Sequence, residues 1–563
     1  MHQEPASPPT DRPFAFGEDW WRQGVVYQVY PRSFADSDGD GFGDLRGLID
    51  HLDYLASGDK GLGVDAIWLS PIYPSPGLDA GYDVADHATI DPRFGTEADF
   101  AELVAQAHRR GIRIVLDLVL NHTSDQHAWF RASRASRSGP HADWYLWRDP
   151  AGQDDEGRPL PPNNWLSYFG GSAWRFEPAR GQFYLHTFLT EQPDLNWRNP
   201  EVHAAQLAIV AGWLERGVDG FRLDVFNLFV KDAELRSNPA RAGGLRPWDG
   251  QVHAYDKDQP GLRDVLRDLR ALVDARPGGM TVGELFEGNP RLAAEYVTDR
   301  HMIFDFGLIE LPWSAEAFER FIRERGAAYG PDRWPTVVFS NHDQSRTATR
   351  LGTGSDPDEI ARAAGFLLLT MRGTPFMYYG EELGLRDVAI PADEIQDPPA
   401  RAAGPEFPWW NRDQCRSPMP WSAGEGAGFT TGRPWLRLAP DAGTRNVEHQ
   451  LADPDSILAM YRRLLAARRA SAALHDGDLE LLPAPATGLL AFVRRAGADQ
   501  ALVVVNFGAA PVEATIDTGQ GSAWQALVSS HLDAPDAFKD GGTAPLRPFE
   551  AVVFVPGPDS EAR

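Results

Sequence analysis

Charged side chains occur within or just after several short runs of apolar residues that have the composition of buried β-strands. One run contains Arg222 and Asp224, another reaches Glu284, and a third is followed by His342 and Asp343. Residues two apart in a strand point to the same face, so Arg222 and Asp224 should lie side by side. Burying charges is costly unless they are paired. The pattern therefore indicates either a structural ion pair or a site of acid–base chemistry.

Three carboxylates that meet at one place are suited to the cleavage of glycosidic bonds. In that chemistry an ionised carboxylate attacks the anomeric carbon, and a second carboxyl, kept protonated by a raised pKa, protonates the leaving oxygen. A third carboxylate stabilises the positive charge that develops. Arg222 would then favour the ionised, nucleophilic form of Asp224. Each residue alone could equally be a salt-bridge partner, but convergence from separate strands favours catalysis.

The elements that must position these residues are eight β-rich runs separated by helical patterns. Several runs are apolar on both faces, as buried strands of a parallel sheet are. Eight strands that alternate with helices predict an α/β fold, a (β/α)8 TIM barrel, whose functional residues gather at the carboxyl ends of the strands. The runs start at Val25, Ala66, Arg113, Phe221, Thr281, His301, Thr336 and Thr374.

The segments between the runs have amphipathic patterns that predict helices. In one of them Phe100, Leu103, Val104 and Ala107 recur at the spacing of a single helix face. A doubly wound open sheet is the alternative arrangement of such elements. The glycine fingerprint G-x-G-x-x-G that would favour it is missing after the first run.

Two segments do not fit the alternation of strands and helices. The stretch before the run at Phe221 is rich in Trp, Pro, Gly and Asn and is too long for a βα loop. We expect a small inserted domain there, after the third strand. Towards the end of the chain, short strands and turns predict a C-terminal antiparallel β-sandwich. The expected divisions are a flexible tail at 1–13, the barrel at 14–122 and 195–471, the inserted domain at 123–194, and the C-terminal β domain at 472–563.

The bulk composition is that of a globular, acidic protein. Its 563 residues exceed what one compact core usually holds, so several domains are expected. The formal net charge of -26 argues against nucleic acid or an anionic membrane as a partner. The single cysteine, Cys415, excludes an intrachain disulfide, and neither a signal-peptide pattern nor an apolar run of transmembrane length is found. We therefore expect a cytoplasmic protein, a monomer or a homodimer.

Four short motifs occur in order along the predicted strands: DLVLNH, GFRLDV, VGEL and SNHD. Together they resemble the four signature regions of the α-amylase family, glycoside hydrolase family 13. The resemblance covers nearly the whole chain, from Trp20 onward. QPDLN (192–196) resembles an additional motif of the oligo-1,6-glucosidase branch of that family. RSPMPW (416–421) resembles a further stretch of the branch, with Pro420 in place of glutamine.

The resemblance implies Asp224 as the nucleophile, Glu284 as the acid/base and Asp343 as the transition-state stabiliser. It also implies a pocket for the glucose at the non-reducing end of the substrate. Asp83 and Arg416 would supply charged, forked hydrogen-bond partners for its hydroxyl groups. For Phe169 and Phe188, packing in the core is the alternative to substrate binding. The expected substrate-binding residues are Asp83, Tyr82, His122, Phe169, Phe188, Gln192, Arg222, Val225, His342 and Arg416.

The loop DSDGDGFGD places carboxylates at alternating positions with glycines between them. Asp36, Asp38, Asp40 and Asp44 offer hard oxygen ligands at a spacing similar to that of an EF-hand, which suits Ca²⁺. The complete EF-hand frame with its terminal Glu is absent, and a solvated acidic turn is the alternative. The resemblance implies a structural cation here, with the carbonyl of Phe42 as a further ligand. We therefore expect bound Ca²⁺ or Mg²⁺ and no organic cofactor.

Three functions are compatible with these residues. The first is a retaining exo-acting α-glucosidase that releases glucose from short gluco-oligosaccharides or glucosides through a covalent glucosyl-enzyme intermediate. The second is an α-glucosyltransferase that passes the same intermediate to a sugar or alcohol. The third, a non-catalytic scaffold relative, is disfavoured because all three acids are present. Val225, directly after the expected nucleophile, is the residue type of relatives that cleave α-1,6 bonds, which slightly favours α-1,6 over α-1,4 linkages.

Overall fold

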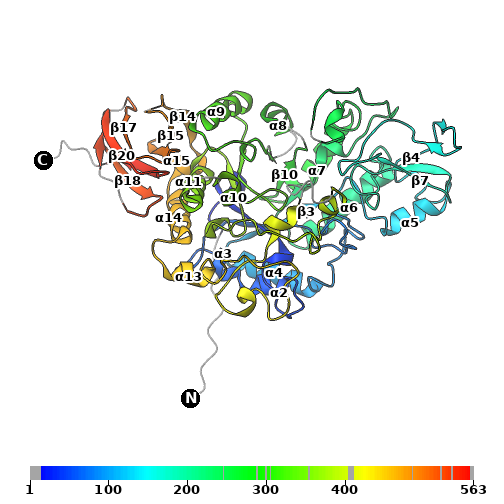
Figure 1. The fold of residues 1–563 in the computed structure, drawn as a ribbon, viewed down its shortest axis with the longest axis horizontal. Helices are drawn as coiled ribbons and strands as arrows, with labels where there is room; N and C mark the ends of the chain where they lie inside the picture. Colours follow the sequence, from blue (N-terminus) through cyan, green and yellow to red (C-terminus); the bar gives the residue numbers. More distant parts are fainter. Residues whose placement is uncertain are drawn as a thin grey trace, which may run out of the picture.

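The computed structural model describes residues 14–557 except 245, 287–288, 298–300, 305, 353–355, 404–410, 485, 520, 522 and 534–536. The expected tail at 1–13 lies outside the described residues. Within the described part, a barrel of strands and helices forms the centre of the molecule (Figure 1).

The barrel is an eight-stranded parallel sheet among the described residues, in the order β11-β10-β9-β3-β2-β1-β13-β12. Its two end strands also meet, because the hydroxyl of Thr336 donates a hydrogen bond of 3.0 Å to the carbonyl of Ile303. The predicted TIM barrel is thus confirmed, and the doubly wound alternative is wrong. The strands are β1 (Val26–Val29), β2 (Ala66–Leu69), β3 (Arg113–Leu118), β9 (Gly220–Leu223), β10 (Met280–Glu284), β11 (Met302–Phe304), β12 (Thr336–Val338) and β13 (Thr374–Tyr378).

Each barrel strand is buried on both faces, and its two faces belong to different cores. In β3, Ile114 and Leu116 pack into the large core shared with the helices, whereas Val115 belongs to a separate cluster with inward-facing residues of the other strands. Because side chains alternate along a strand, Asp117 continues the inward row begun by Val115. The inward row therefore changes from apolar to charged at the carboxyl end of the strand, which delivers polar groups to the barrel mouth.

The helices around the barrel follow the predicted amphipathic patterns. In α4 (Glu97–Arg109), Phe100, Leu103, Val104 and Ala107 are the buried residues, and Thr96 starts the helix with a capping box. Apolar burial of this kind stabilises a fold by roughly 1.5–3 kcal/mol per large side chain. Other barrel helices are α6 (Pro200–Glu215), α7 (Leu262–Asp274), α8 (Pro290–Tyr296), α9 (Ala315–Tyr329) and α11 (Pro357–Thr370).

A small group of strands lies between β3 and β9 in the chain. It contains a three-stranded sheet in the order β4-β8-β7, a two-stranded ribbon of β5 and β6, and helix α5. This group lies at one end of the molecule (Figure 1). Its elements are β4 (Trp147–Arg148), β5 (Gly152–Gln153), β6 (Pro159–Leu160), β7 (Trp174–Glu177), β8 (Gln182–Leu185) and α5 (Ala128–Ala135).

Antiparallel strands at the opposite end of the molecule form the C-terminal domain (Figure 1). One sheet has six strands in the order β14-β15-β16-β21-β18-β19, and β17 pairs with β20 beside it. Helices α14 (Ile457–Ala470) and α15 (Ala472–Asp476) lead from the barrel into this domain. Its strands are β14 (Asp478–Leu481), β15 (Leu489–Ala496), β16 (Asp499–Asn506), β17 (Val512–Ile516), β18 (Ala523–Ser529), β19 (Phe538–Lys539), β20 (Gly542–Leu546) and β21 (Ala551–Pro556).

None of the helices in the described residues is long and apolar enough to cross a bilayer.

A buried ion pair joins the inserted segment to the barrel. The ammonium of Lys231, in the segment after β9, lies 3.0 Å from the carboxylate of Asp194, and both side chains are almost inaccessible to solvent. Lys231 also donates to the side chain of Asn121, and Asp194 accepts hydrogen bonds from the backbone and hydroxyl of Thr187. The pair thus connects the end of the insertion with the loops that follow β3 and β9.

We predict that Lys231→Met lowers the free energy of unfolding by about 3–5 kcal/mol, because it leaves the buried charge of Asp194 without its partner. Urea denaturation measures the change. The double variant Lys231→Met/Asp194→Asn should recover part of the loss, and Lys60→Met, at an exposed lysine, serves as the control. A Lys231→Met protein as stable as the control would contradict the prediction.

Candidate active site

A large cavity opens at the carboxyl ends of the barrel strands. Its volume is about 1130 Å³. The cavity is lined by residues from the loops after several barrel strands and from the inserted segment. All three acids expected to do chemistry line it, together with the following expected substrate-binding residues: Tyr82, His122, Phe169, Phe188 and Val225.

The three acids reach the cavity from three different strands. Asp224 directly follows β9, Glu284 is the last residue of β10, and Asp343 lies in the loop after β12. Val225, next to Asp224, has a φ of 36°, the left-handed region that a β-branched residue rarely adopts. Such strain costs on the order of 1–3 kcal/mol and persists only where the surroundings impose it. The turn ends the strand sharply and leaves Asp224 at the cavity surface.

Arg222 is shared among three carboxylates. One of its terminal nitrogens lies 2.7 Å from Asp117 and 2.7 Å from Asp224, and its other terminal nitrogen contacts Glu284. Burial raises the pKa of Asp224, Arg222 lowers it, and Glu284 and Asp117 raise it again, so that the net pKa is well above the ordinary value. Arg222 thus favours the ionised form of Asp224, as expected, but burial and the neighbouring carboxylates outweigh its effect on the pKa of Asp224.

Asp343 has the opposite electrostatic environment. Burial disfavours its ionised form, but His342, Arg412 and Arg416 favour it and hold the pKa of Asp343 well below the ordinary value. Arg416 lies 2.7 Å and Arg412 3.2 Å from the same carboxylate oxygen. The site therefore contains two carboxyl groups whose pKa values are shifted in opposite directions, lowered at Asp343 and raised at Asp224. That combination is what acid-assisted cleavage of a glycosidic bond requires.

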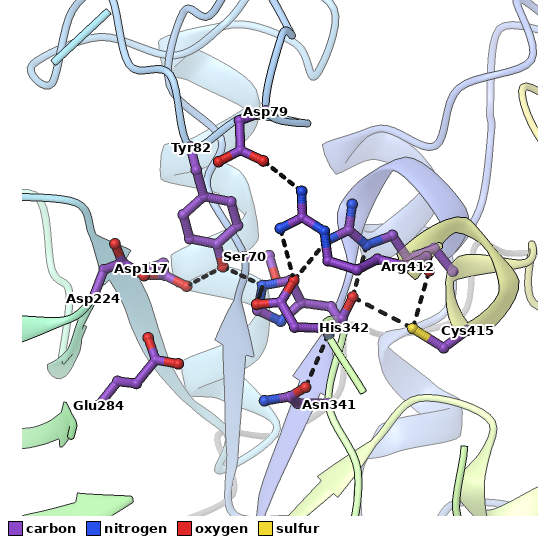
Figure 2. Close-up of polar contacts among 12 residues, drawn as sticks. Ser70, Asp79, Tyr82, Asp117, Asp224, Glu284, Asn341, His342, Arg412 and Cys415 are labelled. Atoms are coloured by element: carbon purple, nitrogen blue, oxygen red, sulfur yellow. Dashed lines mark hydrogen bonds and ion pairs between the residues drawn. The ribbon is translucent and has the colours of Figure 1, made fainter. Parts of the chain in front are cut away.

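A hydrogen-bonded chain supports the site from behind. Gln28 approaches Nδ1 of His342 at 2.8 Å through its amide nitrogen, so that Nδ1 is the acceptor. The Nε2 proton of His342 then points to the hydroxyl of Tyr82 at 2.6 Å, and Tyr82 donates to Asp117 at 2.9 Å (Figure 2). Burial lowers the pKa of His342 to about 3, so its ring is neutral at physiological pH. The chain fixes one tautomer of His342 and links it to Arg222 through Asp117.

The loop after β2 contains two aspartates with different surroundings. The carboxylate of Asp83 is fully buried and accepts hydrogen bonds from the hydroxyl of Ser75 and from the backbone of Leu78 and Asp79. Asp79, by contrast, lines the cavity and lies 2.6 Å from Arg412 (Figure 2). The expectation for Asp83 is therefore corrected: Asp79 is the carboxylate of this loop that faces the cavity, and Asp83 shapes the loop that presents it.

Arg412 and Arg416, in the segment after β13, are distinguished in the same way. Arg416 is buried behind Asp343, where it donates to the carbonyl of His342 at 2.7 Å. Arg412 lines the cavity and contacts Asp79, Asp343 and Asp397. Arg412 therefore takes the place expected for Arg416 at the cavity wall, whereas Arg416 holds Asp343 from the rear.

The remaining expected residues lie behind the cavity wall. Gln192 is fully buried and donates a hydrogen bond of 3.0 Å to Asp79, which orients the carboxylate of Asp79 towards the cavity. Arg222 and His342 are also buried and contact the lining acids without lining the cavity themselves. These three side chains position the groups that face the cavity.

Several lining residues were not predicted from the sequence. Asp79 lies four residues before Asp83, and Arg412 lies four residues before Arg416. In each pair the first residue lines the cavity and the second, of the same type, does not. Only side-chain direction distinguishes the members of each pair. The other lining residues outside our expectation include Tyr168, Phe286, Asn341, Arg241, Arg246 and Lys257. Their loops have no regular spacing that marks a common surface.

The acidic loop after β1 is compact. Carboxylate oxygens of Asp36, Asp38 and Asp40 lie within 4.8 Å of one another. Asp44 instead caps helix α2 (Leu45–Asp50), where it accepts from the backbone of Gly47. Burial raises the pKa of Asp40, although its hydrogen bond from the backbone opposes this, and the neighbouring carboxylates raise it further. Hard oxygen ligands crowded in this way fit a divalent cation.

Known proteins resemble this chain along most of its length. The family model described as alpha amylase, catalytic domain, matches residues 28–477. A probable alpha-glucosidase of Rhizobium meliloti (strain 1021) is 44% identical over 506 residues, which cover 87% of this chain and 89% of the relative. An oligo-1,6-glucosidase of Heyndrickxia coagulans is 37% identical over 578 residues, which cover 95% and 99%. The solved structure of an alpha-glucosyl transfer enzyme matches with a TM-score of 0.88 and 41% identity, over 96% of this chain and 99% of that one.

The barrel and the carboxylates at its mouth define a glycoside hydrolase. The family match spans most of the chain, and the relatives are similar over nearly their whole length. The chain belongs to the α-amylase family, glycoside hydrolase family 13.

The two aspartates of the β2 loop give different expected effects on substitution. We predict that Asp79→Asn lowers kcat/KM by about 10- to 100-fold, since a charged hydrogen-bond partner is lost from the cavity wall. Asp83→Asn should instead lower the thermal unfolding midpoint, because a buried acceptor of three hydrogen bonds is replaced. Steady-state kinetics and thermal unfolding of both variants measure these effects. The reverse assignment, in which Asp79→Asn only destabilises, would contradict the geometry.

Proposed function

We propose that the protein is a retaining, exo-acting α-glucosidase that hydrolyses terminal α-1,4- or α-1,6-linked glucose from short oligosaccharides or glucosides. The observation that carries this proposal is the arrangement of Asp224 and Glu284 on neighbouring strands, joined by Arg222, with Asp343 ionised across the same cavity. Closely spaced carboxyl groups are typical of the retaining reaction, in which one of them attacks the sugar directly.

In this reaction Asp224 is the nucleophile and Glu284 the acid/base. Glu284 acts as the proton donor when the glycosidic oxygen approaches, and Asp224 attacks the anomeric carbon as an ionised carboxylate. The bond to the leaving oxygen breaks as Glu284 donates its proton. Water, deprotonated by Glu284, then attacks the glucosyl–Asp224 ester and releases α-glucose. Asp343 stabilises the oxocarbenium-like charge in both steps because it remains ionised.

The closed inner end of the cavity supports exo action. Arg412 bridges Asp79, in the loop after β2, and Asp397, in the segment after β13. Tyr82 and His122 line the same end. A wall held by ion pairs leaves no continuation of the cavity for a longer chain beyond the terminal glucose. One glucosyl unit is therefore bound between this wall and the catalytic acids, and the leaving group occupies the outer part.

A second candidate is an α-glucosyltransferase with the same intermediate. The alpha-glucosyl transfer enzyme noted above has 41% identity and covers 96% of this chain. The volume of about 1130 Å³ exceeds that needed for one sugar, so an acceptor other than water has room beside Glu284. The two candidates differ only in what attacks the glucosyl–enzyme.

We predict that Asp224→Asn reduces kcat/KM on activated aryl α-glucosides by about 10⁴-fold or more, because the attacking carboxylate is removed. Asp332→Asn, at an exposed loop aspartate, is the control and should retain full activity. Proton NMR of the wild-type reaction should show α-glucose as the first product. Activity in Asp224→Asn, or β-glucose as the first product, would contradict the assigned roles.

Substrate preference separates the candidates. A panel of sucrose, maltose, isomaltose, trehalose and starch tests linkage, and we propose a preference for isomaltose over maltose from the β-branched wall at Val225. Discrimination by one such wall is limited to a few kcal/mol. Preference for starch would contradict exo action, and products without free glucose at high maltose concentration would favour the transferase.

The raised pKa of Asp224 predicts how activity depends on pH. Attack on the sugar requires the ionised form of Asp224, so kcat/KM should fall as the pH drops through the raised pKa of Asp224. Asp117→Asn removes a neighbouring negative charge and leaves more of Arg222 to Asp224, which lowers the pKa of Asp224. The acid limb of the pH–rate profile should therefore move to lower pH. A shift to higher pH would contradict this account.

We further propose that the loop after β1 binds a structural Ca²⁺ or Mg²⁺. Asp36, Asp38 and Asp40 would supply carboxylate ligands, and Phe42 a carbonyl ligand. Thr430 donates to the carboxylate of Asp36, which ties the loop to a segment far along the chain. A cation there would therefore stabilise the fold, and it has no part in the chemistry at Asp224 and Glu284.

We predict that a chelator lowers the thermal unfolding midpoint of the wild-type protein, because a ligand bound at 100 times its Kd stabilises the native state by about 2.7 kcal/mol. The double variant Asp38→Ala/Asp40→Ala should unfold at the same temperature with and without chelator. A wild-type midpoint that chelator leaves unchanged, and that added Ca²⁺ or Mg²⁺ does not raise, would contradict the proposed site.

A further inference from the structure

The cavity extends well beyond the pocket for one glucosyl unit. Catalytic cavities that hold whole drug-sized ligands have volumes of roughly 300–1,000 Å³, and this one measures about 1130 Å³. Its outer wall comes largely from the long connection between β9 and α7. The lining residues from this connection include Arg241, Arg246, Asp249, His253 and Lys257. The outer part of the cavity therefore has a chemical character of its own.

That outer wall concentrates positive charge in an otherwise acidic protein. The chain has 80 acidic and 54 basic residues, yet Arg241, Arg246 and Lys257, all from one connection, line the cavity. The carboxylates of the outer cavity are Asp249 and Glu310. Arg246 contacts Asp249 at 2.7 Å, so that this carboxylate is already engaged. Arg241 and Lys257 outnumber the remaining carboxylate, Glu310, so the net charge of the wall is positive.

Arg241 is held in place by its backbone. Its amide donates to the carbonyl of Gly250 at 2.8 Å, and the adjacent Ala240 pairs with Gln251. Within the described part of the chain, the guanidinium of Arg241 makes no hydrogen bond and no ion pair. An anchored backbone with an exposed, unpaired cation at a cavity wall is suited to a bound oxyanion.

Aromatic side chains connect this cationic wall to the acid/base. Phe286 follows Glu284 by two residues, and its ring lies 4.7 Å from that of Tyr168 in an edge-to-face arrangement. The guanidinium of Arg246 lies 4.3 Å above the ring of Tyr168. Since Glu284 would protonate the leaving oxygen, the group bonded to that oxygen must lie on this side. The leaving group would therefore pack against the two rings with the cations at its far end.

We propose that the leaving-group side of the cavity recognises a glucoside whose second unit carries an oxyanion substituent, with Arg241 and Arg246 as its anchors. This inference rests on the proposed α-glucosidase function and names its substrate class. Phosphate and carboxylate groups share the chemistry that a guanidinium binds. The second unit is either a sugar or an aryl group, because both pack against aromatic rings.

Two matched substrate pairs test the inference. The first pair is maltose with a 6-phosphate on its reducing glucose, against maltose itself. The second is 4-carboxyphenyl α-glucoside against 4-carbamoylphenyl α-glucoside. The quantity measured is the ratio of kcat/KM for the charged member to that for the neutral member. Dividing this ratio for a variant by the same ratio for the wild type cancels the different reactivities of the leaving groups.

Arg241→Gln should lower this ratio by about fivefold for at least one pair, as expected for loss of an exposed ion pair. The double variant Arg241→Gln/Arg246→Gln should lower it further. Arg320→Gln, at an exposed arginine of α9 away from the cavity, should leave the ratio unchanged. Raising the ionic strength should reduce the wild-type ratio, because salt screens exposed charges.

The outcomes separate the possibilities. A response confined to the phosphate pair identifies phosphorylated disaccharides, and a response confined to the aryl pair identifies carboxylated aryl glucosides. A ratio that stays within twofold of wild type in both variants, for both pairs, overturns the inference while hydrolysis of the neutral substrates still supports the proposed function. If the wild-type protein hydrolyses no member of either pair, the proposed function fails and the inference fails with it.

Discussion

One guanidinium among three buried carboxylates is the constraint on which the catalytic site depends. Arg222 contacts Asp117, Asp224 and Glu284, and its side chain is 1% exposed. Burial and the neighbouring carboxylates oppose Arg222 and raise the pKa of Asp224 well above its ordinary value. A retaining glycosidase needs one carboxyl group that donates a proton and one that is ionised. The same crowding that destabilises the folded protein therefore prepares the site for acid–base catalysis.

The barrel makes this arrangement possible through the alternation of side chains along each strand. The inward rows begin with residues such as Val115 and Val282 and end with Asp117 and Glu284. The apolar part of each row packs with its neighbours and fixes the register of the strands, and the register fixes where the charged ends meet. Each strand thus provides both the packing that holds the barrel and one group of the site. A slip of one residue would turn the acid towards the helices.

The sequence was sufficient for the fold and for the three acids, because both follow from strand periodicity and from motifs at strand ends. It was not sufficient within loops. Asp79 and Asp83 are separated by three residues without a regular period, and a hydrogen-bond pattern of the backbone decides which one faces the cavity. Arg412 and Arg416 differ in the same way. The contact of Arg222 with three carboxylates was not predicted in full either. It depends on distances between three strands, which no local sequence pattern contains.

The ion pair between Arg412 and Asp79 joins two segments that are 333 residues apart in the chain. In the proposed exo reaction this pair closes the inner end of the cavity. A sugar that enters through the barrel mouth has to leave by the same opening. The leaving group, which is the shortened substrate, must therefore diffuse away before the bound glucose does. The shortened substrate thus loses contact with the enzyme after every cleavage. Such an enzyme works distributively: it shortens many chains by one unit each and cannot travel along a single chain.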